Sequence, residues 1–352
     1  MAIVFVEGFD MYNGLTNTAT AGGITSRWDY FANLSLLAGR FGGQAAAIAY
    51  GTSSKYLAAS LGASYTQGAL GFAFYASALP SNNIDIAYVG TTASLAQLSV
   101  VFTVGGGLAV YRGILGTGTS ALLGATALNI IPVGAYSYIE LEFVIDNSVG
   151  SAILYLSGTP VLTLSGVDTQ NLTDNTFSLL SFGTPGGLGY GFVGRFDDVY
   201  LTDTPSRLGE QRVFTANVDA DASPSDWAAS GGAVAPYTMI DEVLCDGDTT
   251  YISSSTLNAR AMFGVGNLPV SPTGIQAVQI SSFGRKTDTG LRKIQLQYED
   301  ASANLYTSSE YTLAGGPGYG RQIDLLQNNP ITTAGWTASE VNAMKIGVKV
   351  ST

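Results

Sequence analysis

The sequence contains no histidine among its 352 residues. Nucleophilic systems of the Ser-His-Asp and Cys-His type need an imidazole as general base, and many zinc sites need it as a ligand. The sequence therefore excludes these catalytic systems and His-ligated zinc. There is one cysteine, Cys245, so no internal disulfide can form. Without an activating histidine beside it, we interpret this thiol as a small core residue.

Charged residues are also scarce, at 12% of the chain, which is about half the usual fraction. The net charge of −11 leaves no basic surface to neutralise phosphates or to approach an anionic membrane, so we expect no nucleic-acid and no membrane partner. Hydrophobic residues at 46% together with 44 glycines are typical of a globular all-β protein and not of a disordered chain.

The scarcity of charge is concentrated in residues 1–204, which hold 12 acidic and 5 basic residues, against 14 acidic and 10 basic in residues 205–352. Two interpretations stay open. The surface of the first part is covered by Ser, Thr and Gly, or much of it is buried against other subunits.

Residues 138–169 contain the clearest strand pattern in the sequence. Turns at 147–150 and 158–160 separate an alternating run at its start from two shorter ones, 151–156 and 161–165. Three antiparallel strands that are apolar on one face need a second sheet to cover that face, which predicts an all-β sandwich. In the first run Ile139, Leu141, Phe143 and Ile145 are predicted to point inward, and Tyr138, Glu140, Glu142 and Asp146 to form an ordinary solvated face.

The same residues carry a resemblance. Residues 138–169, the opening residues 6–12 and residues 194–201 together resemble the concanavalin A-like (LamG-type) jelly roll, over about residues 1–204. The resemblance implies an N-terminal jelly-roll sandwich. It does not imply an activity, because many unrelated functions are found on this scaffold.

A boundary is predicted near residues 203–206, where basic residues become more frequent. We therefore expect a concanavalin A-like β-sandwich over residues 1–204 and a second, smaller β-rich domain over 205–352. Strands are expected in this second domain at 274–282, 292–298, 309–313 and 345–350.

A capping box is present in Thr337 to Glu340 and predicts a short C-terminal helix over residues 338–344. In the last strand, Lys345 and Lys349 are expected to point outward, where they would discourage edge-to-edge pairing.

The second domain carries its own resemblance. Residues 246–252, 285–292 and 336–343 resemble the C-terminal module of structural proteins from tailed bacteriophages. This resemblance implies a virion protein that packs against other virion proteins and against copies of itself, with a trimer as the commonest arrangement. Residues 1–7 have no basic segment of a secretory signal, and no apolar run is long enough to span a bilayer. We expect a protein made in the host cytoplasm without a signal peptide and incorporated into the virion.

Glu140 and Glu142 are the candidate catalytic pair, because jelly-roll glycosidases use two carboxylates on one strand. Residues two apart on a strand lie about 6.5–7 Å apart on one face. A retaining mechanism needs carboxyl groups about 5–5.5 Å apart. Leu141 also stands where the similar glycosidase motif has an acidic residue. We therefore predict no catalytic residues, and a glycosidase remains an alternative class.

Two acidic loops and one acidic pair are candidate calcium ligands, because carboxylate oxygens bind this ion. Asp219, Asp221 and Asp226 lack the glycine and glutamate that a helix–loop–helix calcium loop requires, since those positions are Ala222 and Ala228.

Asp246 and Asp248 lie in the second acidic loop. Asp197 and Asp198 are neighbours on a predicted strand, so their side chains are expected to point to opposite faces of the sheet. We predict no metal and no cofactor, with a bound calcium as the alternative.

Tyr190 and Tyr319 each stand in a glycine-rich loop, at residues 186–191 and 315–320. Neither loop follows a strand into a helix, so neither is a dinucleotide fingerprint. Both tyrosines are candidate carbohydrate-binding residues, because a tyrosine ring can stack on a sugar. The competing interpretation, which we favour, is that each one closes its loop.

Together these observations predict a non-enzymatic structural component of a tailed-bacteriophage virion, tail-associated or part of an appendage, that acts through protein–protein assembly. The alternatives are a capsid-surface decoration protein, or a lectin-like module that binds a glycan of the host surface.

Overall fold

The structure, a computed structural model, describes residues 1–12, 27–31, 34–50, 55–184, 191–232, 234–242, 246–269, 272–315 and 318–352. It is nearly all β, with 53% strand and 4% helix, so the predicted all-β fold class is confirmed. Among the described residues, no helix combines the length and the apolar character needed to cross a membrane.

The chain divides into two units. Met1–Asp10 and Arg27–Val213 form the first, which we call the sandwich, and Met11–Ser26 and Phe214–Thr352 form the second, which we call the C-terminal unit. Residues 205–213 therefore group with the sandwich and not with the C-terminal unit. The domain boundary at residue 204 stays a prediction.

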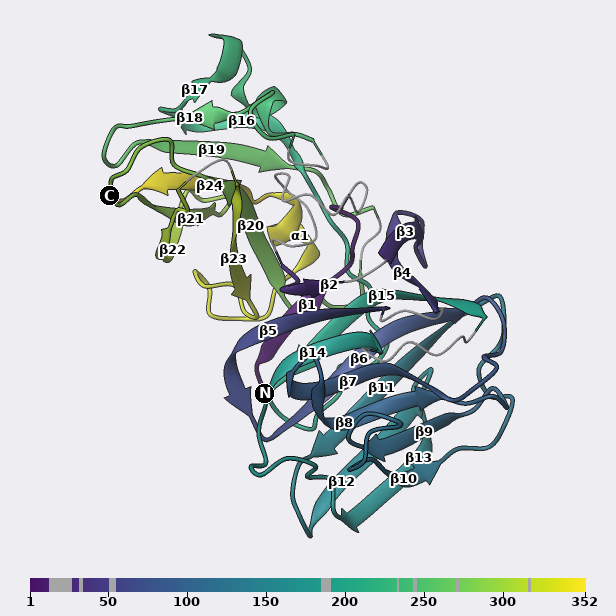
Figure 1. Ribbon diagram of the computed structural model, residues 1–352. Helices are drawn as coiled ribbons and strands as arrows, with labels where there is room; N and C mark the ends of the chain where they lie inside the picture. The colour runs from purple at the N-terminus through teal and green to yellow at the C-terminus, as the bar shows by residue number, and fades with distance from the viewer. Residues whose placement is uncertain are drawn as a thin grey trace. The chain divides into compact units, whose positions relative to one another are not determined.

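The sandwich consists of two antiparallel sheets (Figure 1). One sheet has the order β13-β12-β11-β6-β15-β4-β3, with β1 beside β15, and the other has the order β10-β9-β8-β7-β14-β5-β2. The strands of the first sheet are β1 (Ile3–Glu7), β3 (Leu34–Ala38), β4 (Gln44–Tyr50), β6 (Gln67–Ala76), β11 (Tyr136–Val144), β12 (Gly150–Leu156), β13 (Thr159–Val167) and β15 (Phe192–Thr202). Those of the second sheet are β2 (Tyr30–Phe31), β5 (Lys55–Tyr65), β7 (Ile84–Thr92), β8 (Leu95–Phe102), β9 (Leu108–Arg112), β10 (Ala121–Ala125) and β14 (Phe177–Thr184).

The predicted hairpins of residues 138–169 are confirmed as β11, β12 and β13, which pair in that order. The inward side chains of β11, Ile139, Leu141 and Phe143, are at most 2% exposed. Aromatic rings join the two sheets. Phe72 of β6 lies 5.2 Å from Phe182 of β14, ring centroid to ring centroid, in an edge-to-face arrangement that suits the ring quadrupoles. The core of the sandwich therefore lies between the sheets.

The C-terminal unit contains a five-stranded sheet in the order β16-β19-β24-β21-β22 and two short ribbons, β17-β18 and β20-β23. Its elements are β16 (Val218–Ser225), β17 (Ala228–Ala229), η2 (Ser230–Gly232), η3 (Pro236–Met239), β18 (Ile252–Ser253), β19 (Arg260–Val265), β20 (Val278–Gly284), β21 (Lys293–Glu299), β22 (Leu305–Thr312), β23 (Gly320–Leu326), α1 (Ala338–Asn342) and β24 (Lys345–Val350).

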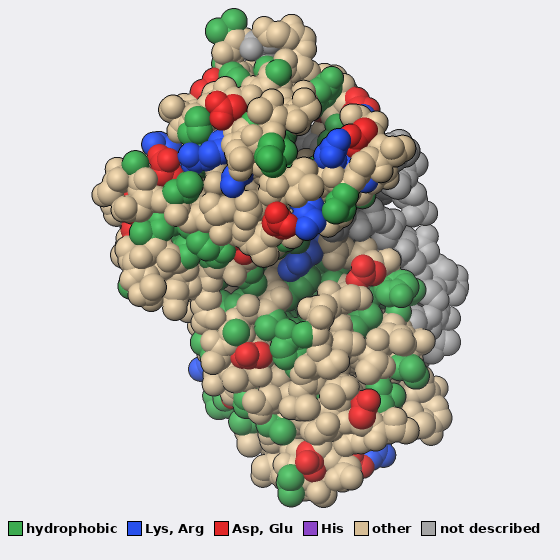
Figure 2. Space-filling view, turned by 90° about the vertical axis from the view of Figure 1, so that its left-hand side faces the viewer, with side chains coloured by type: hydrophobic (Ala, Val, Ile, Leu, Met, Phe, Trp, Pro, Cys, Tyr) green, Lys and Arg blue, Asp and Glu red, His purple; other side chains and the backbone are tan. Residues whose placement is uncertain are grey.

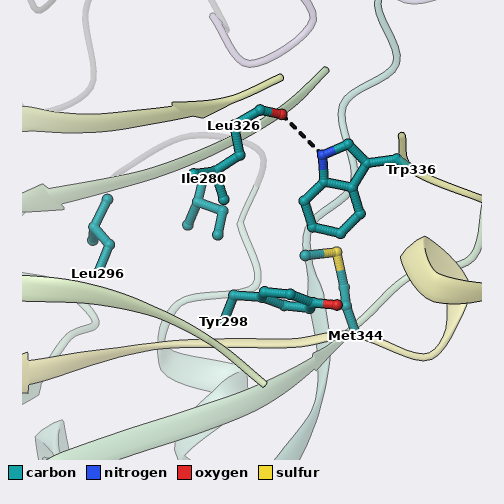
Figure 3. Close-up of a cluster of buried hydrophobic side chains, with 6 residues drawn as sticks. All are labelled: Ile280, Leu296, Tyr298, Leu326, Trp336 and Met344. Carbon is teal, nitrogen blue, oxygen red and sulfur yellow. Dashed lines mark hydrogen bonds between the residues drawn. The ribbon is translucent and has the colours of Figure 1, made fainter. Parts of the chain in front are cut away.

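A compact apolar cluster forms the core of this unit (Figure 3). Trp336 is 5% exposed, and its indole Nε1–H donates to the carbonyl of Leu326 at 2.9 Å. Its ring lies 5.1 Å from the ring of Tyr298, centroid to centroid. The remaining members are Ile280, Leu296 and Met344. The buried polar atom of the tryptophan is thus satisfied within the core.

The predicted capping box is present. Thr337 accepts from the backbone N–H of Glu340, and the Glu340 carboxylate accepts in return, so helix α1 begins where the sequence predicts. The prediction for the last strand was wrong in one respect. β24 lies between β19 and β21, so it is not an edge, and Lys345 forms an ion pair with Glu299 at 2.7 Å. The alternating sequence pattern predicts the strand itself but not which strands pair with it in the sheet.

Candidate functional site

The outer face of β11 is not the solvated face that the sequence predicts. Glu140 is completely buried and Tyr138 is 1% exposed, although both point away from the core between the sheets. A buried carboxylate needs hydrogen-bond and charge partners, because water no longer stabilises it.

Both glutamates have such partners. The Tyr200 hydroxyl donates to Glu140 Oε1 at 2.6 Å, and the Arg207 guanidinium donates to Glu140 Oε2 at 3.0 Å. The backbone N–H of Arg207 donates to Glu142 Oε1 at 3.0 Å, and the Tyr155 hydroxyl donates to Glu142 Oε2 at 3.0 Å. All four carboxylate oxygens are therefore engaged by groups of the same chain.

These bonds hold residues 205–213, which we call the strap, against the sheet. The Leu208 N–H donates to the Tyr200 hydroxyl oxygen at 2.9 Å, and the Arg207 guanidinium lies 4.3 Å above the centre of the Tyr155 ring. The strap thus contacts side chains of β11, β12 and β15. A catalytic acid or base must reach the reacting atoms of a substrate. In this structure the oxygens of both carboxylates bond instead to the strap and to tyrosines of the same sheet.

The second anchor of the strap is a pair of aspartates on β15. The sequence predicts that Asp197 and Asp198 point to opposite faces, and this was wrong, because the pairing register shifts between Asp197 and Tyr200 and Asp198 has φ of 51°. Such a bulge turns a side chain away from strict alternation. Asp197 Oδ2 accepts from the Arg40 backbone N–H at 2.8 Å, and Asp198 Oδ2 accepts from the Arg40 guanidinium at 3.4 Å. Asp198 Oδ1 accepts from the Val213 N–H at 2.8 Å, at the end of the strap.

Burial shifts the acidity of this pair. Burial, the largest cause, and the adjacent Asp198 carboxylate together raise the pKa of Asp197 to about 8. Burial also raises the pKa of Asp198 to about 6, against the opposing effects of the Val213 N–H and of Arg40. Asp10 adds negative charge near both. The folded protein therefore holds protons here over a pH range in which an unfolded aspartate has lost them.

We expect stability to fall as pH rises across this range. A carboxyl group with a raised pKa binds more protons in the folded state than in the unfolded state between about pH 4 and pH 8, so the free energy of unfolding decreases with pH there. Asp197→Asn is expected to make this decrease shallower, as measured by urea denaturation between pH 5 and pH 8. Asp146→Asn is the control, since hydrogen bonds from Val149 and Ser148 hold the pKa of that exposed carboxyl below its usual value. An unchanged slope in Asp197→Asn would contradict the assignment.

Gly71 allows Tyr200 to reach its position over the sheet. A Cβ atom at Gly71 would lie 2.1 Å from Cε1 of the Tyr200 ring. Gly71→Ala is therefore expected to displace the ring, break the network at Glu140 and lower the free energy of unfolding by about 2 kcal/mol. Gly118→Ala is the control, because no atom of the described residues lies within 4 Å of a Cβ there. Equal stability of the two variants in urea denaturation would show that the Tyr200 ring does not need this position.

The structure describes only one of the two candidate carbohydrate-binding tyrosines. Tyr190 lies outside the described residues. Tyr319 is half-buried, and its hydroxyl donates to the Gly247 carbonyl at 3.0 Å and to Asp248 Oδ1 at 2.8 Å. Arg285 pairs with both oxygens of the Asp248 carboxylate, and its guanidinium lies 5.3 Å above the Tyr319 ring. Tyr319 therefore ties its loop to the turn at residues 246–250, and carbohydrate binding by it stays a prediction.

Three of the candidate calcium ligands, Asp221, Asp226 and Asp246, accept hydrogen bonds from backbone N–H groups of the same chain. Asp221 accepts from the Tyr237 N–H at 2.7 Å, and Asp226 accepts from the Arg260 N–H at 3.0 Å. Asp246 accepts from the Thr250 N–H at 3.1 Å. Within the described ranges no group of three or more acidic, cysteine or histidine side chains is arranged to hold a metal ion. Calcium binding stays an untested alternative, and Cys245 lies outside the described residues.

Sequence reasoning missed Arg40, Tyr200 and Arg207, the residues that organise this site. A signal was present in the composition, because Arg40 is one of only five basic residues before position 205, and Arg207 follows the boundary directly. A few cations in a chain poor in charge are candidates for buried ion pairs.

No family model matches the chain, and no curated protein matches it. Among solved structures, the carbohydrate-binding module CBM66 from Bacillus subtilis is similar at 11% identity and a TM-score of 0.34, covering 49% of this chain and 92% of that one. The alginate lyase Aly36B is similar at 11% identity and a TM-score of 0.39, covering 59% and 98%. CG-16, a homodimeric agglutinin from chicken liver, is similar at 9% identity and a TM-score of 0.29, covering 42% and 100%.

These similar structures include carbohydrate-binding and lectin-like proteins as well as a lyase. At such TM-scores the likenesses carry no argument about what this chain does. The assignment of a sandwich depends on the order and pairing of its own strands.

Proposed function

We propose that the chain is a non-enzymatic structural component of a tailed-bacteriophage virion, tail-associated or part of an appendage, that works by assembling with other proteins. The observation that carries the proposal is the state of Glu140 and Glu142. All their oxygens bind Tyr155, Tyr200 and the strap residue Arg207, so the one carboxylate pair with a catalytic precedent serves to hold the fold together.

The low charge of the sandwich supports assembly. Figure 2 shows the face turned to the viewer, where red and blue side chains are more frequent over the C-terminal unit and the sandwich is mostly tan and green. Surfaces that are depleted in charge are typical of the centre of protein–protein interfaces. The virion itself is inferred from the resemblance of residues 246–252, 285–292 and 336–343 to the C-terminal module of phage structural proteins.

Two measurements test this proposal. An antibody raised against the recombinant chain is expected to label purified, intact particles of the phage that encodes it, seen by electron microscopy. The recombinant chain is also expected to leave a panel of polysaccharides uncleaved. Particles that carry no label, or turnover of a saccharide that is abolished in Glu140→Gln, would overturn the proposal.

A glycan-binding role is the second candidate, and the arrangement around Tyr319 favours it. Its ring is half-exposed beside the 62% exposed side chain of Asp248 and the guanidinium of Arg285, which together offer a stacking surface and polar groups. Screening on a glycan array would detect it. Binding that is lost in Tyr319→Ala and retained in Tyr319→Phe would support stacking on the ring, and no binding on a broad array would contradict it.

A further inference from the structure

Three loops at one end of the sandwich form a single surface. They are residues 77–83 between β6 and β7, 103–107 between β8 and β9, and 126–135 between β10 and β11. Backbone hydrogen bonds join them. The Asn129 N–H donates to the Gly105 carbonyl at 2.7 Å, and the Gly134 N–H donates to the Ala76 carbonyl, where the first loop begins, at 2.9 Å.

This surface, which we call the loop end, is apolar and uncharged. The three loops contain no Asp, Glu, Lys or Arg. Four large apolar side chains on them are exposed: Leu79 at 43%, Val104 at 50%, Leu128 at 65% and Val133 at 48%. Leu79 and Leu128 lie close to the turn between β8 and β9, since Cβ atoms added at Gly106 and Gly105 would be 3.1 Å and 2.6 Å from them. Exposed apolar side chains that are gathered on loops already fixed by hydrogen bonds are typical of interaction sites.

We infer that the loop end is the surface through which two copies of this chain contact each other, an inference that rests on the proposed assembly function. The chain has a net charge of −11, so two copies repel one another wherever their acidic surfaces approach. The loop end brings no like charges together, and a twofold contact places its apolar side chains against their equivalents. A basic or acidic partner would find no charge there to recognise.

The outer edge of the sandwich is a poorer route to pairing. β13 is the edge strand beside β12, but it contains Pro160 and its register shifts at two places. Proline and bulges are the devices that prevent an edge strand from adding another strand. The loops are therefore a better surface for self-contact than the β13 edge.

The contact is expected to be weak. Four side chains account for only part of the roughly 800 Å² per partner that a stable complex buries. Association should therefore depend on concentration, and it becomes strong only where many copies are held together. Because it is apolar, added salt should leave it unchanged or strengthen it.

Sedimentation velocity on the full chain tests this inference, at concentrations up to about 1 mM, where weak contacts become visible. The wild-type chain is expected to self-associate, and Val104→Asp and Leu128→Asp are each expected to raise the dissociation constant at least about tenfold. Leu95→Asp is the matched control. Leu95 is 48% exposed at the opposite end of β8, roughly 30 Å from Val104 at the usual rise of a strand, and its variant should behave like the wild type.

Circular dichroism of each variant establishes that it is folded. A wild-type chain that stays monomeric, an equal effect of Leu95→Asp, or association that weakens with added salt would each overturn the inference. The proposed function fails separately, if particles of the phage lack the chain, whatever the outcome of the sedimentation experiment.

Discussion

Replacing Arg207 by alanine is expected to lower the free energy of unfolding of the sandwich by about 3 kcal/mol. Glu140 is completely buried, and among the described residues Arg207 supplies the cation that bonds to its carboxylate, at 3.0 Å. Removing one partner of such a pair leaves a charge that neither water nor protein neutralises, which is the costly case for a buried ion pair. Breaking a buried ion pair in this way typically costs about 3–5 kcal/mol. Because the Arg207 side chain is 30% exposed, we expect a loss at the lower end of that range. Urea denaturation followed by circular dichroism measures it.

Arg112→Ala is the matched control. Arg112 pairs with Asp168, but both side chains are partly exposed, at 28% and 39%, and an exposed pair contributes less than about 1 kcal/mol. A further variant, Glu140→Gln combined with Arg207→Ala, should cost less than the sum of the two single changes, because the uncompensated charge is gone. If Arg207→Ala costs no more than Arg112→Ala, then Glu140 does not depend on the strap.

Replacing Trp336 by alanine is expected to cost the C-terminal unit about 3–5 kcal/mol, which is the usual effect of deleting a buried tryptophan. Trp336 is 5% exposed, packs against Tyr298 and bonds to the Leu326 carbonyl, so the change leaves a cavity and an unsatisfied acceptor. Trp336→Phe keeps an aromatic ring and loses the hydrogen bond, and it is expected to cost less. Differential scanning calorimetry measures both without relying on tryptophan fluorescence.

Val234→Ala provides the comparison for the C-terminal unit. Its side chain is 99% exposed, so its loss should change stability by less than about 0.5 kcal/mol. A Trp336→Ala variant that unfolds like Val234→Ala would mean that the cluster of Figure 3 does not form the core of this unit.

Local patterns predicted the local structure well. The hairpins β11, β12 and β13 follow from strict alternation and from turns rich in Gly, Asn and Pro, and the start of α1 follows from Thr337 and Glu340. These features need only neighbours in sequence. The end of α1 at Asn342, two residues before the predicted end, is within the usual uncertainty of helix termini.

The site itself could not be predicted in this way. By alternation, the side chain of Glu140 points outward from the sandwich core. It is nevertheless buried, because Arg207, which lies 67 residues later in the chain, covers it and donates to its carboxylate. The bulge at Asp198 breaks the alternation that placed its side chain on the other face. The central place of β24 depends on which strands pair, and that is a property of the whole sheet. In each case the deciding contact joins residues far apart in the chain.

Amide hydrogen exchange in the strap tests the central claim most directly. The N–H groups of Arg207, Leu208 and Val213 donate to Glu142, Tyr200 and Asp198. If the carboxylate-bearing face is occupied by the chain itself, these three amides should exchange as slowly as those of the strands beneath them, and exchange should accelerate in Arg207→Ala. Exchange at the rate of an unstructured peptide in the wild-type chain would show that the face is open, and it would contradict the structural role assigned to Glu140 and Glu142.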